Sequence, residues 1–306
     1  AQESLYRARR RAVAPTPPRL PCRAQMAAQG AVASNGEPSS LVDAQLPDLA
    51  DRALAEAERH FDDRSSSWSL TKNEGDIELW EQPMAGAAFP MYRSALTVAN
   101  QKPTSLTAVA STVCSAFCRR FYDSTFDRAC LLRRGKDDGE AVIGLFAKPT
   151  PITPATFFMG VFGIKRSTAD SGSERITVAC SRAPDEFDAP LQEQLAACGA
   201  GGEIKRSSTR LWAFDVQYSA DGALRMSMLV AIERNASWLP AFVIKQFLAD
   251  SLVAGIDCVW QMSRAGMIPR SVVSFWNDEA PEHLQECAVA GGRVFVSTSL
   301  LDAFAR

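Results

Sequence analysis

The stretch Leu224–Met262, LRMSMLVAIERNASWLPAFVIKQFLADSLVAGIDCVWQM, decides the fold, because it joins an apolar strand, a tight corner and one long amphipathic helix. In its first part apolar residues occupy every second position, the period at which strand side chains point to the same face of a sheet. One face carries Met226, Met228, Val230 and Ile232, which alternate with Arg225, Ser227, Leu229 and Ala231. The pattern predicts a half-buried strand with one fully apolar face.

A helix is predicted over residues 242–262. Ser237-Trp238-Leu239-Pro240 precedes it, and proline is tolerated in a first turn because its missing N–H has no helical partner there. When successive residues are placed about 100° apart, as in an α-helix, the polar residues fall on one side and a second face lies opposite them. This face is Ile244, Phe247, Leu248, Ser251, Ala254, Gly255 and Cys258. Its middle is small, which predicts unfilled space beneath the helix.

The composition limits the classes of function. The chain has 306 residues, 46% of them hydrophobic, and a formal net charge of −2, so no overall positive field favours nucleic acid or an anionic membrane. The eight cysteines contain no CxxC pair, and His60 and His283 are the two histidines. We therefore expect no metal, no cofactor, and buried free thiols in a reducing compartment.

Both ends of the chain differ from its middle. Residues 1–46 are rich in Arg, Pro and Ala and poor in acids, a composition typical of an organellar transit segment or of a basic linker held by a partner. Residues 266–306 form a C-terminal extension that the pattern does not assign to an element. The predicted domain is residues 47–265.

Within this domain the order of elements favours an antiparallel sheet. Pro47 is expected to begin a helix that ends near Phe61, and Pro103 another that ends near Phe121. Short turns join the intervening strands, as in antiparallel rather than parallel sheets. Strands are predicted at 68–82 (a hairpin), 92–99, 127–134, 140–148, 157–165, 174–181, 205–218 and 224–232. Residues 183–202 are expected to be a surface insertion with a short helix at 191–198.

Four motifs of the chain belong together. They are Trp68 with Gly75-Asp76-Ile77-Glu78-Leu79-Trp80, Tyr92-Arg93-Ser94, Pro154-Ala155-Thr156-Phe157-Phe158, and the Trp238-Leu239-Pro240 corner followed by Val243, Ile244, Gln246 and Phe247. In this order they resemble the START (StAR-related lipid transfer) domain family. The resemblance covers about residues 68–262. It implies an α+β helix-grip fold, in which a curved antiparallel sheet wraps around the long C-terminal helix, with extended tails at both ends.

The resemblance also implies a lipid site. Met226, Met228, Val230 and Ile232 would form the floor of an apolar cavity, and Ile244, Phe247, Ser251 and Gly255 its lid, although each could equally be an ordinary core residue. Arg210 would contact the lipid head group or be a solvated strand residue. The family's Arg-Asp pair is Ala155-Thr156 here, and the Arg that often follows falls near Val161. These departures argue against sterol specificity.

Two functions follow from these observations. The first is a non-enzymatic lipid-binding or transfer module that contacts membranes peripherally. The alternative is a structural subunit of a large respiratory or photosynthetic complex, which would bind protein partners through residues 1–46 and 266–306. A third hypothesis is an enzyme that works inside the cavity, but no pattern of residues in the sequence indicates one. The expected location is a mitochondrion or chloroplast, or otherwise the cytoplasm, and no nucleic-acid partner is expected.

Overall fold

The computed structural model describes residues 40–264 except 64, 66, 88, 100–104, 137–138, 150–153, 169–172, 200–203, 220 and 234–240. The elements are α3 (Ser40–Asp62), β1 (Ser69–Glu74), β2 (Ile77–Gln82), β3 (Met91–Val98), α4 (Leu106–Cys114), α5 (Ala116–Tyr122), β4 (Phe126–Arg134), β5 (Glu140–Ala147), β6 (Thr156–Thr168), β7 (Glu174–Arg182), η1 (Asp185–Phe187), α6 (Gln192–Ala197), β8 (Lys205–Arg206), β9 (Thr209–Tyr218), β10 (Leu224–Ile232) and α7 (Ala241–Arg264). The predicted α+β class is confirmed. Residues 1–39 of the N-terminal tail, the C-terminal extension and the Trp238-Leu239-Pro240 corner lie outside the described residues.

The strands form one ten-stranded sheet in the order β1-β2-β3-β10-β9-β7-β6-β5-β4, with β8 beside β6. The main ladder is antiparallel throughout, as predicted, and only the short β6–β8 pair is parallel. The pairing of β3 with β10 joins an early strand to the last one, so the centre of the sheet depends on contacts between residues far apart in the sequence.

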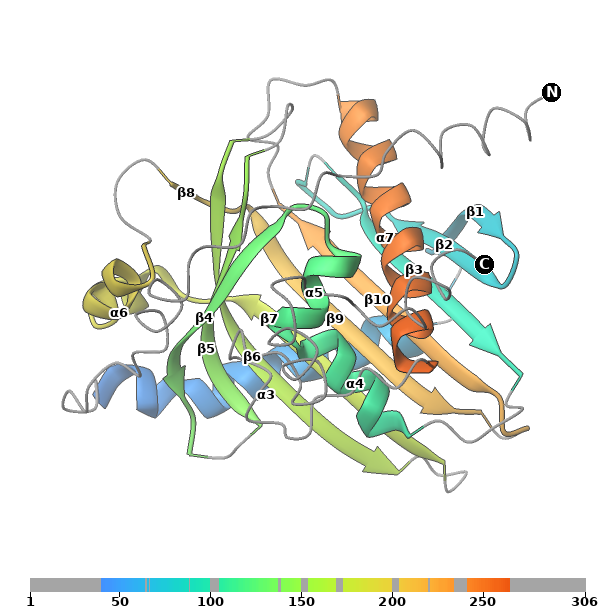
Figure 1. Cartoon of the computed structure of the whole chain (residues 1–306), viewed down its shortest axis with the longest axis horizontal. Coiled ribbons are helices and arrows are strands. Elements are labelled where there is room, and N and C mark those ends of the chain that lie inside the picture. Colours follow the sequence, from blue (N-terminus) through green and yellow to red (C-terminus); the bar gives the residue numbers. More distant parts are fainter. Residues whose placement is uncertain are drawn as a thin grey trace, which may run out of the picture. The chain divides into compact units, whose positions relative to one another are not determined.

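Helices cover both faces of this sheet (Figure 1). α3 contacts β5, β6, β7 and β9, whereas α7 contacts β2, β3 and β10 as well as α4 and α5. The buried side chains separate accordingly: one large apolar cluster lies on the α7 side, and two smaller clusters lie under α3. We call these two sides the α7 face and the α3 face.

Strand β10 is buried on both faces. Met226 and Met228 lie in the α7-face cluster, as the alternation predicts. Leu229 and Ala231 on the opposite face are also fully buried, because α3 and its neighbours cover them. The expectation of a half-buried strand is therefore wrong, since the sequence near β10 does not show that a helix from the start of the chain packs behind it.

The N-terminal helix is longer than predicted. α3 begins at Ser40, with Pro47 inside it rather than at its start. Proline inside a helix removes one hydrogen bond, but Val42 and Leu46 on either side of this turn are completely buried. Tertiary packing thus outweighs the cost of the proline, and a boundary after residue 46 would divide the helix.

The helix predicted from Pro103 to Phe121 is two helices. Ser115 has an extended backbone (φ −66°, ψ 121°), and its hydroxyl accepts a hydrogen bond from the amide of Cys118. Serine caps a new helix well in this way, because its side chain satisfies an amide that lacks a helical acceptor. α4 therefore ends at Cys114 and α5 begins at Ala116 in a new direction.

The segment 183–202 does contain the predicted short helix, α6, but it is not merely a surface loop. Phe187, Leu191 and Leu195 are buried and pack with Val42 and Leu46 of α3. The amphipathic spacing of these three residues is short and easily missed. The insertion therefore supplies part of the core on the α3 face.

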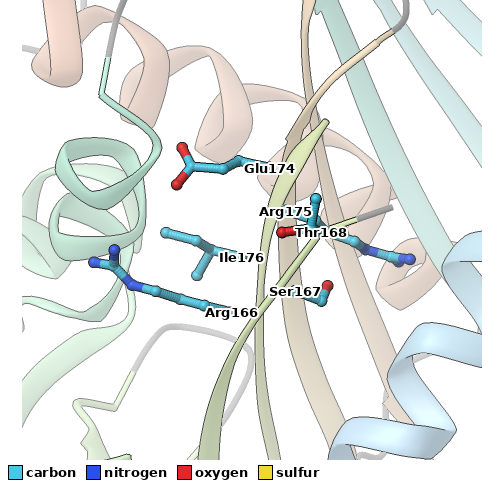
Figure 2. Close-up of a pocket in the computed structure, with 6 residues that line it drawn as sticks. All are labelled: Arg166, Ser167, Thr168, Glu174, Arg175 and Ile176. Atoms are coloured by element: carbon cyan, nitrogen blue, oxygen red, sulfur yellow. The ribbon is translucent and has the colours of Figure 1, made fainter. Parts of the chain in front are cut away.

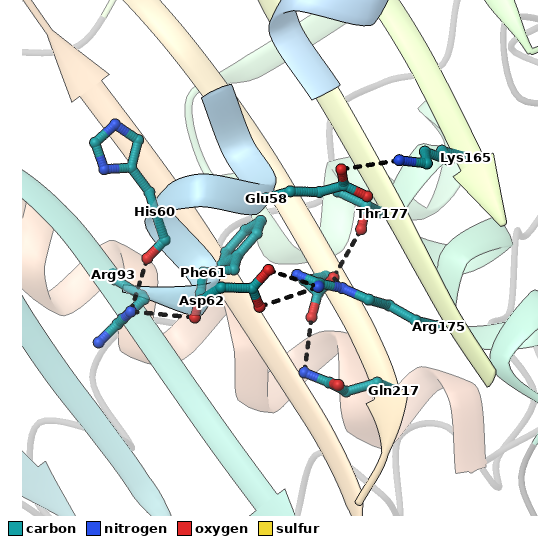
Figure 3. Close-up of polar contacts among 10 residues, drawn as sticks. Glu58, His60, Phe61, Asp62, Arg93, Lys165, Arg175, Thr177 and Gln217 are labelled. Atoms are coloured by element: carbon teal, nitrogen blue, oxygen red, sulfur yellow. Dashed lines mark hydrogen bonds and ion pairs between the residues drawn. The ribbon is translucent and has the colours of Figure 1, made fainter. Parts of the chain in front are cut away.

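Buried charges fasten the end of α3 to the sheet (Figure 3). Arg93 of β3 is 5% exposed and donates hydrogen bonds from Nη1 to the carbonyls of His60, 2.8 Å away, and Phe61, 3.5 Å away. From the same nitrogen, Arg93 donates to the carbonyl of Asp63, 3.3 Å away. Its guanidinium also lies 4.4 Å from the ring centroid of Trp68. A cation at this position satisfies carbonyls that have no helical donor and opposes the negative end of the helix dipole.

A second arginine joins α3 to β7 and β9 (Figure 3). Arg175 donates from Nε to Asp215, 2.6 Å away, and from Nη1 to both oxygens of Asp62 at 3.0 Å. Asp215 is 2% exposed and also accepts a 2.8 Å hydrogen bond from Thr177. Burial raises the pKa of Asp215 and Arg175 opposes this shift.

The two aspartates of this network provide a matched pair of substitutions. We expect Asp215→Ala to destabilise the fold by about 3–5 kcal/mol, because it leaves a buried guanidinium without its main partner. Asp62→Ala should cost at most about 1 kcal/mol, since that side chain is 60% exposed. Urea unfolding of both variants measures the difference. Equal losses would contradict the assignment of Asp215 as the structural partner.

Candidate functional site

The predicted floor residues do share one face of β10. Met226 and Met228 are 0% and 2% exposed, and Val230 is partly buried against the same cluster. Ile232, at the end of the strand, is only partly buried. The alternation in the sequence thus identifies the face correctly and weakens where the strand ends.

The predicted lid face of α7 is partly wrong. Ala254 is exposed, and Phe247 and Ser251 are only half-buried, whereas Gly255 and Cys258 are buried. The side chain of Ile244 lies outside the described residues. The largest apolar residues buried on this helix are Leu252, Val253, Ile256, Val259 and Met262. Because α4 and α5 contact α7 from the side, the buried arc is wider than sheet packing alone would require and is displaced from the predicted one.

Floor and lid meet directly at Gly255. A Cβ atom placed on Gly255 would lie 3.7 Å from Sδ of Met228 and 3.7 Å from the carbonyl oxygen of Tyr122. These are ordinary van der Waals distances for an added atom, so the space between Gly255, Met228 and α5 is about the size of one methyl group. A ligand that passes between α7 and β10 here must first separate them.

This contact predicts the effect of adding one methyl group. We expect Gly255→Ala to stabilise the protein by about 0.5–1 kcal/mol, because alanine has the higher helix propensity and its Cβ fits without a clash. Gly255→Leu should instead destabilise it, since the longer side chain must displace Met228 or α5. Thermal unfolding measures both variants. A loss of stability in Gly255→Ala would show that α7 packs differently against β10.

Arg210 does not lie where the resemblance implies. Its guanidinium pairs with Glu56 of α3 and therefore reaches the α3 face, opposite the predicted cavity. The cause is a register shift: Ala231 pairs with Leu211 but Ile232 pairs with Thr209, so Arg210 is an extra residue in the ladder. Alternation along β9 cannot predict the side of a bulged residue. The expected head-group role of Arg210 is therefore withdrawn.

The structure brings a different arginine to the α7 face. Arg119 of α5 is 15% exposed, and its Nε donates a 3.1 Å hydrogen bond to Asp123 one turn later. Its guanidinium carbon lies 5.0 Å from the ring centroid of Trp212 and 5.7 Å from that of Phe126. Trp212 belongs to the same apolar cluster as Met228 and the buried residues of α7.

This guanidinium has unused hydrogen-bonding capacity. Its two Nη nitrogens donate to no group within the part of the chain that the structure describes. Burial alone would lower the pKa of Arg119, but Tyr122 and Asp123 raise it above its ordinary value, so the cation is retained. The spacing of Arg119 and Asp123, four residues apart, does indicate an ion pair along one helix. The sequence does not show, however, that Arg119 rather than Arg120 is turned inward.

The described surface also has a cleft of about 170 Å³ between the ends of β6 and β7 (Figure 2). It is lined by Arg166, Ser167, Thr168, Glu174, Arg175 and Ile176. Figure 2 shows Arg166, Glu174 and Ile176 on one side of the two strands and Arg175 on the other. Arg166 donates to Thr107 of α4, and Arg175 is held by its two aspartates, so both arginines of the cleft already contact a helix. This cleft is small and polar, unlike a lipid site.

Other chemistries have little support in the described residues. His60 lies on α3, and burial is the main reason that its pKa is lowered. Within residues 40–264 as described, no three His, Cys, Asp or Glu side chains gather as a metal ion would need. No helix in that same part of the chain is both long and apolar enough to cross a membrane.

The sequence and the fold were each compared with those of known proteins. No family model and no curated protein matches the sequence. Among solved structures, human StAR-related lipid transfer protein 5 matches with a TM-score of 0.55 at 11% identity, over 72% of this chain and 98% of that one. Human STARD10 matches with a TM-score of 0.53 at 9% identity, over 70% of this chain and 79% of that one.

The fold is that of a START domain. At such low identity the likeness establishes the fold alone, and the START-like order of strands and helices confirms the expectation from the four sequence motifs. The helix-grip arrangement corresponds here to α7 lying on the α7 face of the sheet. On the α3 face, α3 and the 183–202 insertion form a second layer, whose buried residues pack against the sheet.

Proposed function

We propose that this START-like domain binds one lipid on its α7 face and transfers it between membranes without catalysing a reaction. Two structures of the same fold support the proposal: one is a human StAR-related lipid transfer protein, and the other is human STARD10. The observation that carries it in this chain is Arg119, a partly buried cation with unused donors among aromatic and apolar side chains.

The chemistry of this region suits a lipid with a polar or anionic head group. The Nη donors of Arg119 would hydrogen-bond a phosphate or carbonyl oxygen, while Asp123 keeps the guanidinium oriented. Met226 and Met228 have flexible side chains that adapt to an acyl chain of variable shape. Burying roughly 300 Å² of acyl surface would contribute about 7 kcal/mol, similar in size to the cost of extracting it from a bilayer.

Binding requires α7 to move. Only about one methyl group of space separates Gly255 from Met228, so an acyl chain would enter only when α7 shifts away from β10 or the methionines repack. Such a movement is a conformational gate, and its rate rather than the net binding energy would then limit transfer.

The neighbouring arginines give the test of this site. We expect Arg119→Met to weaken the capture of a phospholipid by about 10–100-fold, because one charge-assisted hydrogen bond contributes roughly 1.5–3 kcal/mol. Arg120→Met is the matched control, since Arg120 is exposed and one residue away. Native mass spectrometry after incubation with mixed liposomes, and transfer of a fluorescent phospholipid between vesicles, measure both variants.

The outcomes separate the two functions. Equal lipid capture by wild type and Arg119→Met would remove Arg119 from the site. If no lipid remains bound to the wild-type chain while a stoichiometric protein complex forms through residues 1–46 and 266–306, the structural-subunit alternative holds instead. The mitochondrial or chloroplast location suggested by the Arg-rich segment stays a prediction.

A further inference from the structure

Two cysteines far apart in the sequence meet on the α3 face. Cys130 lies on the edge strand β4, and Cys198 follows α6 in the insertion. Their side chains interact with each other, and both residues pack at the border of the cluster that contains Phe187 and Leu195. Both are partly exposed, whereas Cys114, Cys118, Cys180 and Cys258 are buried.

Local contacts hold this pair in place. Arg128, two residues before Cys130, donates to the carbonyl oxygen of Cys198 from Nε at 3.2 Å and from Nη2 at 3.0 Å. Its guanidinium carbon lies 4.1 Å from the ring centroid of Phe146, which fixes the arginine against β5. The insertion is thus tied to the edge strand beside the two sulfur atoms.

The neighbouring strand leaves room for the sulfur of Cys130. Gly144 of β5 is the direct partner of Cys130 in the ladder. A Cβ atom on Gly144 would lie only 2.8 Å from the Cys130 sulfur, closer than real side chains allow. A residue without a side chain is therefore needed here for Cys130 to turn towards Cys198.

The electrostatics distinguish the two thiols from the others. The interaction with the Cys130 thiol, helped by the charge of Arg128, lowers the pKa of Cys198 despite burial. Burial raises the pKa of Cys180 and of Cys258 to about 12 and that of Cys118 to about 11. Because the thiolate is the reactive form, Cys198 is the described cysteine best suited to react at neutral pH.

We propose that Cys198 and Cys130 are a peroxide-reactive pair that forms a reversible disulfide between the insertion and the edge strand β4. The Cys198 thiolate attacks one oxygen of a hydroperoxide, which breaks the O–O bond and gives a sulfenic acid and an alkoxide or hydroxide ion. The Cys130 sulfur then attacks the Cys198 sulfur and water leaves, with the Cys130 proton and the sulfenic hydroxyl. A thiol reductant such as glutathione restores both cysteines.

The disulfide would lock the insertion onto the sheet. Cys198 ends the short segment that buries Phe187, Leu191 and Leu195 against α3, and the bond would add a covalent link to its contact with β4. The pair lies on the face opposite α7, so this inference does not rest on the proposed lipid site. The expected effect of oxidation is on the order and stability of the insertion.

Peptide mapping of the full chain tests the bond directly. Trypsin releases Cys130 in residues 129–133 and Cys198 in residues 183–205, and each peptide contains a single cysteine. After treatment with hydrogen peroxide at pH 7 and blocking of free thiols, we expect these two peptides to appear linked, and dithiothreitol to separate them. Oxidation that modifies other cysteines but yields no linked 129–133/183–205 peptide would overturn the proposal.

Three variants assign the roles of the sulfur atoms. Cys130→Ser should leave Cys198 as a sulfenic acid that a dimedone probe labels. Cys198→Ser should give neither the disulfide nor dimedone labelling of Cys130. Cys258→Ala, which removes a buried thiol on α7, should leave the link unchanged. If dimedone labels Cys130 in the Cys198→Ser variant as fast as it labels Cys198 in the Cys130→Ser variant, Cys198 is not the attacking thiol.

A kinetic readout does not depend on the disulfide. Iodoacetamide at pH 7 should alkylate Cys198 of the native chain at least about tenfold faster than Cys118, Cys180 or Cys258, because their burial keeps them protonated and shielded. Arg128→Leu should slow the alkylation of Cys198, since it removes the nearby cation. Equal rates at all of these cysteines in the folded protein would contradict the proposal.

Discussion

The burial of the central strands on both faces is the constraint on which the structure depends. Strands β7, β9 and β10 carry buried side chains towards α7 and towards α3, so neither helical layer can be removed without exposing the sheet. Two-sided burial explains why α3 tolerates Pro47 and why charged residues such as Asp215 and Arg93 are enclosed with their partners. A buried charge is costly alone, and each of these is paired or hydrogen-bonded.

The same constraint shapes the α7 face. α7 is held by the sheet and also by α4 and α5, which are separate helices because Ser115 caps the second of them. The break turns α5 so that Arg119 lies beside Trp212, where its Nε meets Asp123 and its other nitrogens have no partner among the described residues. A polar anchor within an apolar layer is the arrangement that a lipid with one polar end requires, and it comes from a helix that the resemblance did not highlight.

The α3 face has a different character. Its polar groups are engaged with one another: Arg175 with two aspartates, Arg210 with Glu56, and Arg93 with the end of α3. The insertion extends this face with its own small core and brings Cys198 to Cys130. Ligand binding on one face and thiol chemistry on the other would be physically separate, because the sheet lies between them.

The sequence by itself determined the elements whose signals are local. The period-two alternation of Met226 and Met228, the hairpin turn at Gly75 and the long C-terminal helix are set by nearby residues, and all are present in the structure. The START resemblance rested on such local motifs, so the fold class followed from them. Short-range patterns of this kind persist because they satisfy the backbone and one buried face together.

Only the tertiary structure decided which side chains meet. The bulge in β9 sends Arg210 to the α3 face, the lateral contacts of α4 and α5 shift the buried arc of α7, and the cap at Ser115 turns Arg119 inward. Cys130 and Cys198 are brought together by the docking of the insertion onto α3. Each outcome depends on packing between segments distant in the chain, and no periodicity within one segment encodes it. The elements follow from local sequence, whereas the polar anchor and the thiol pair follow from how those elements are packed.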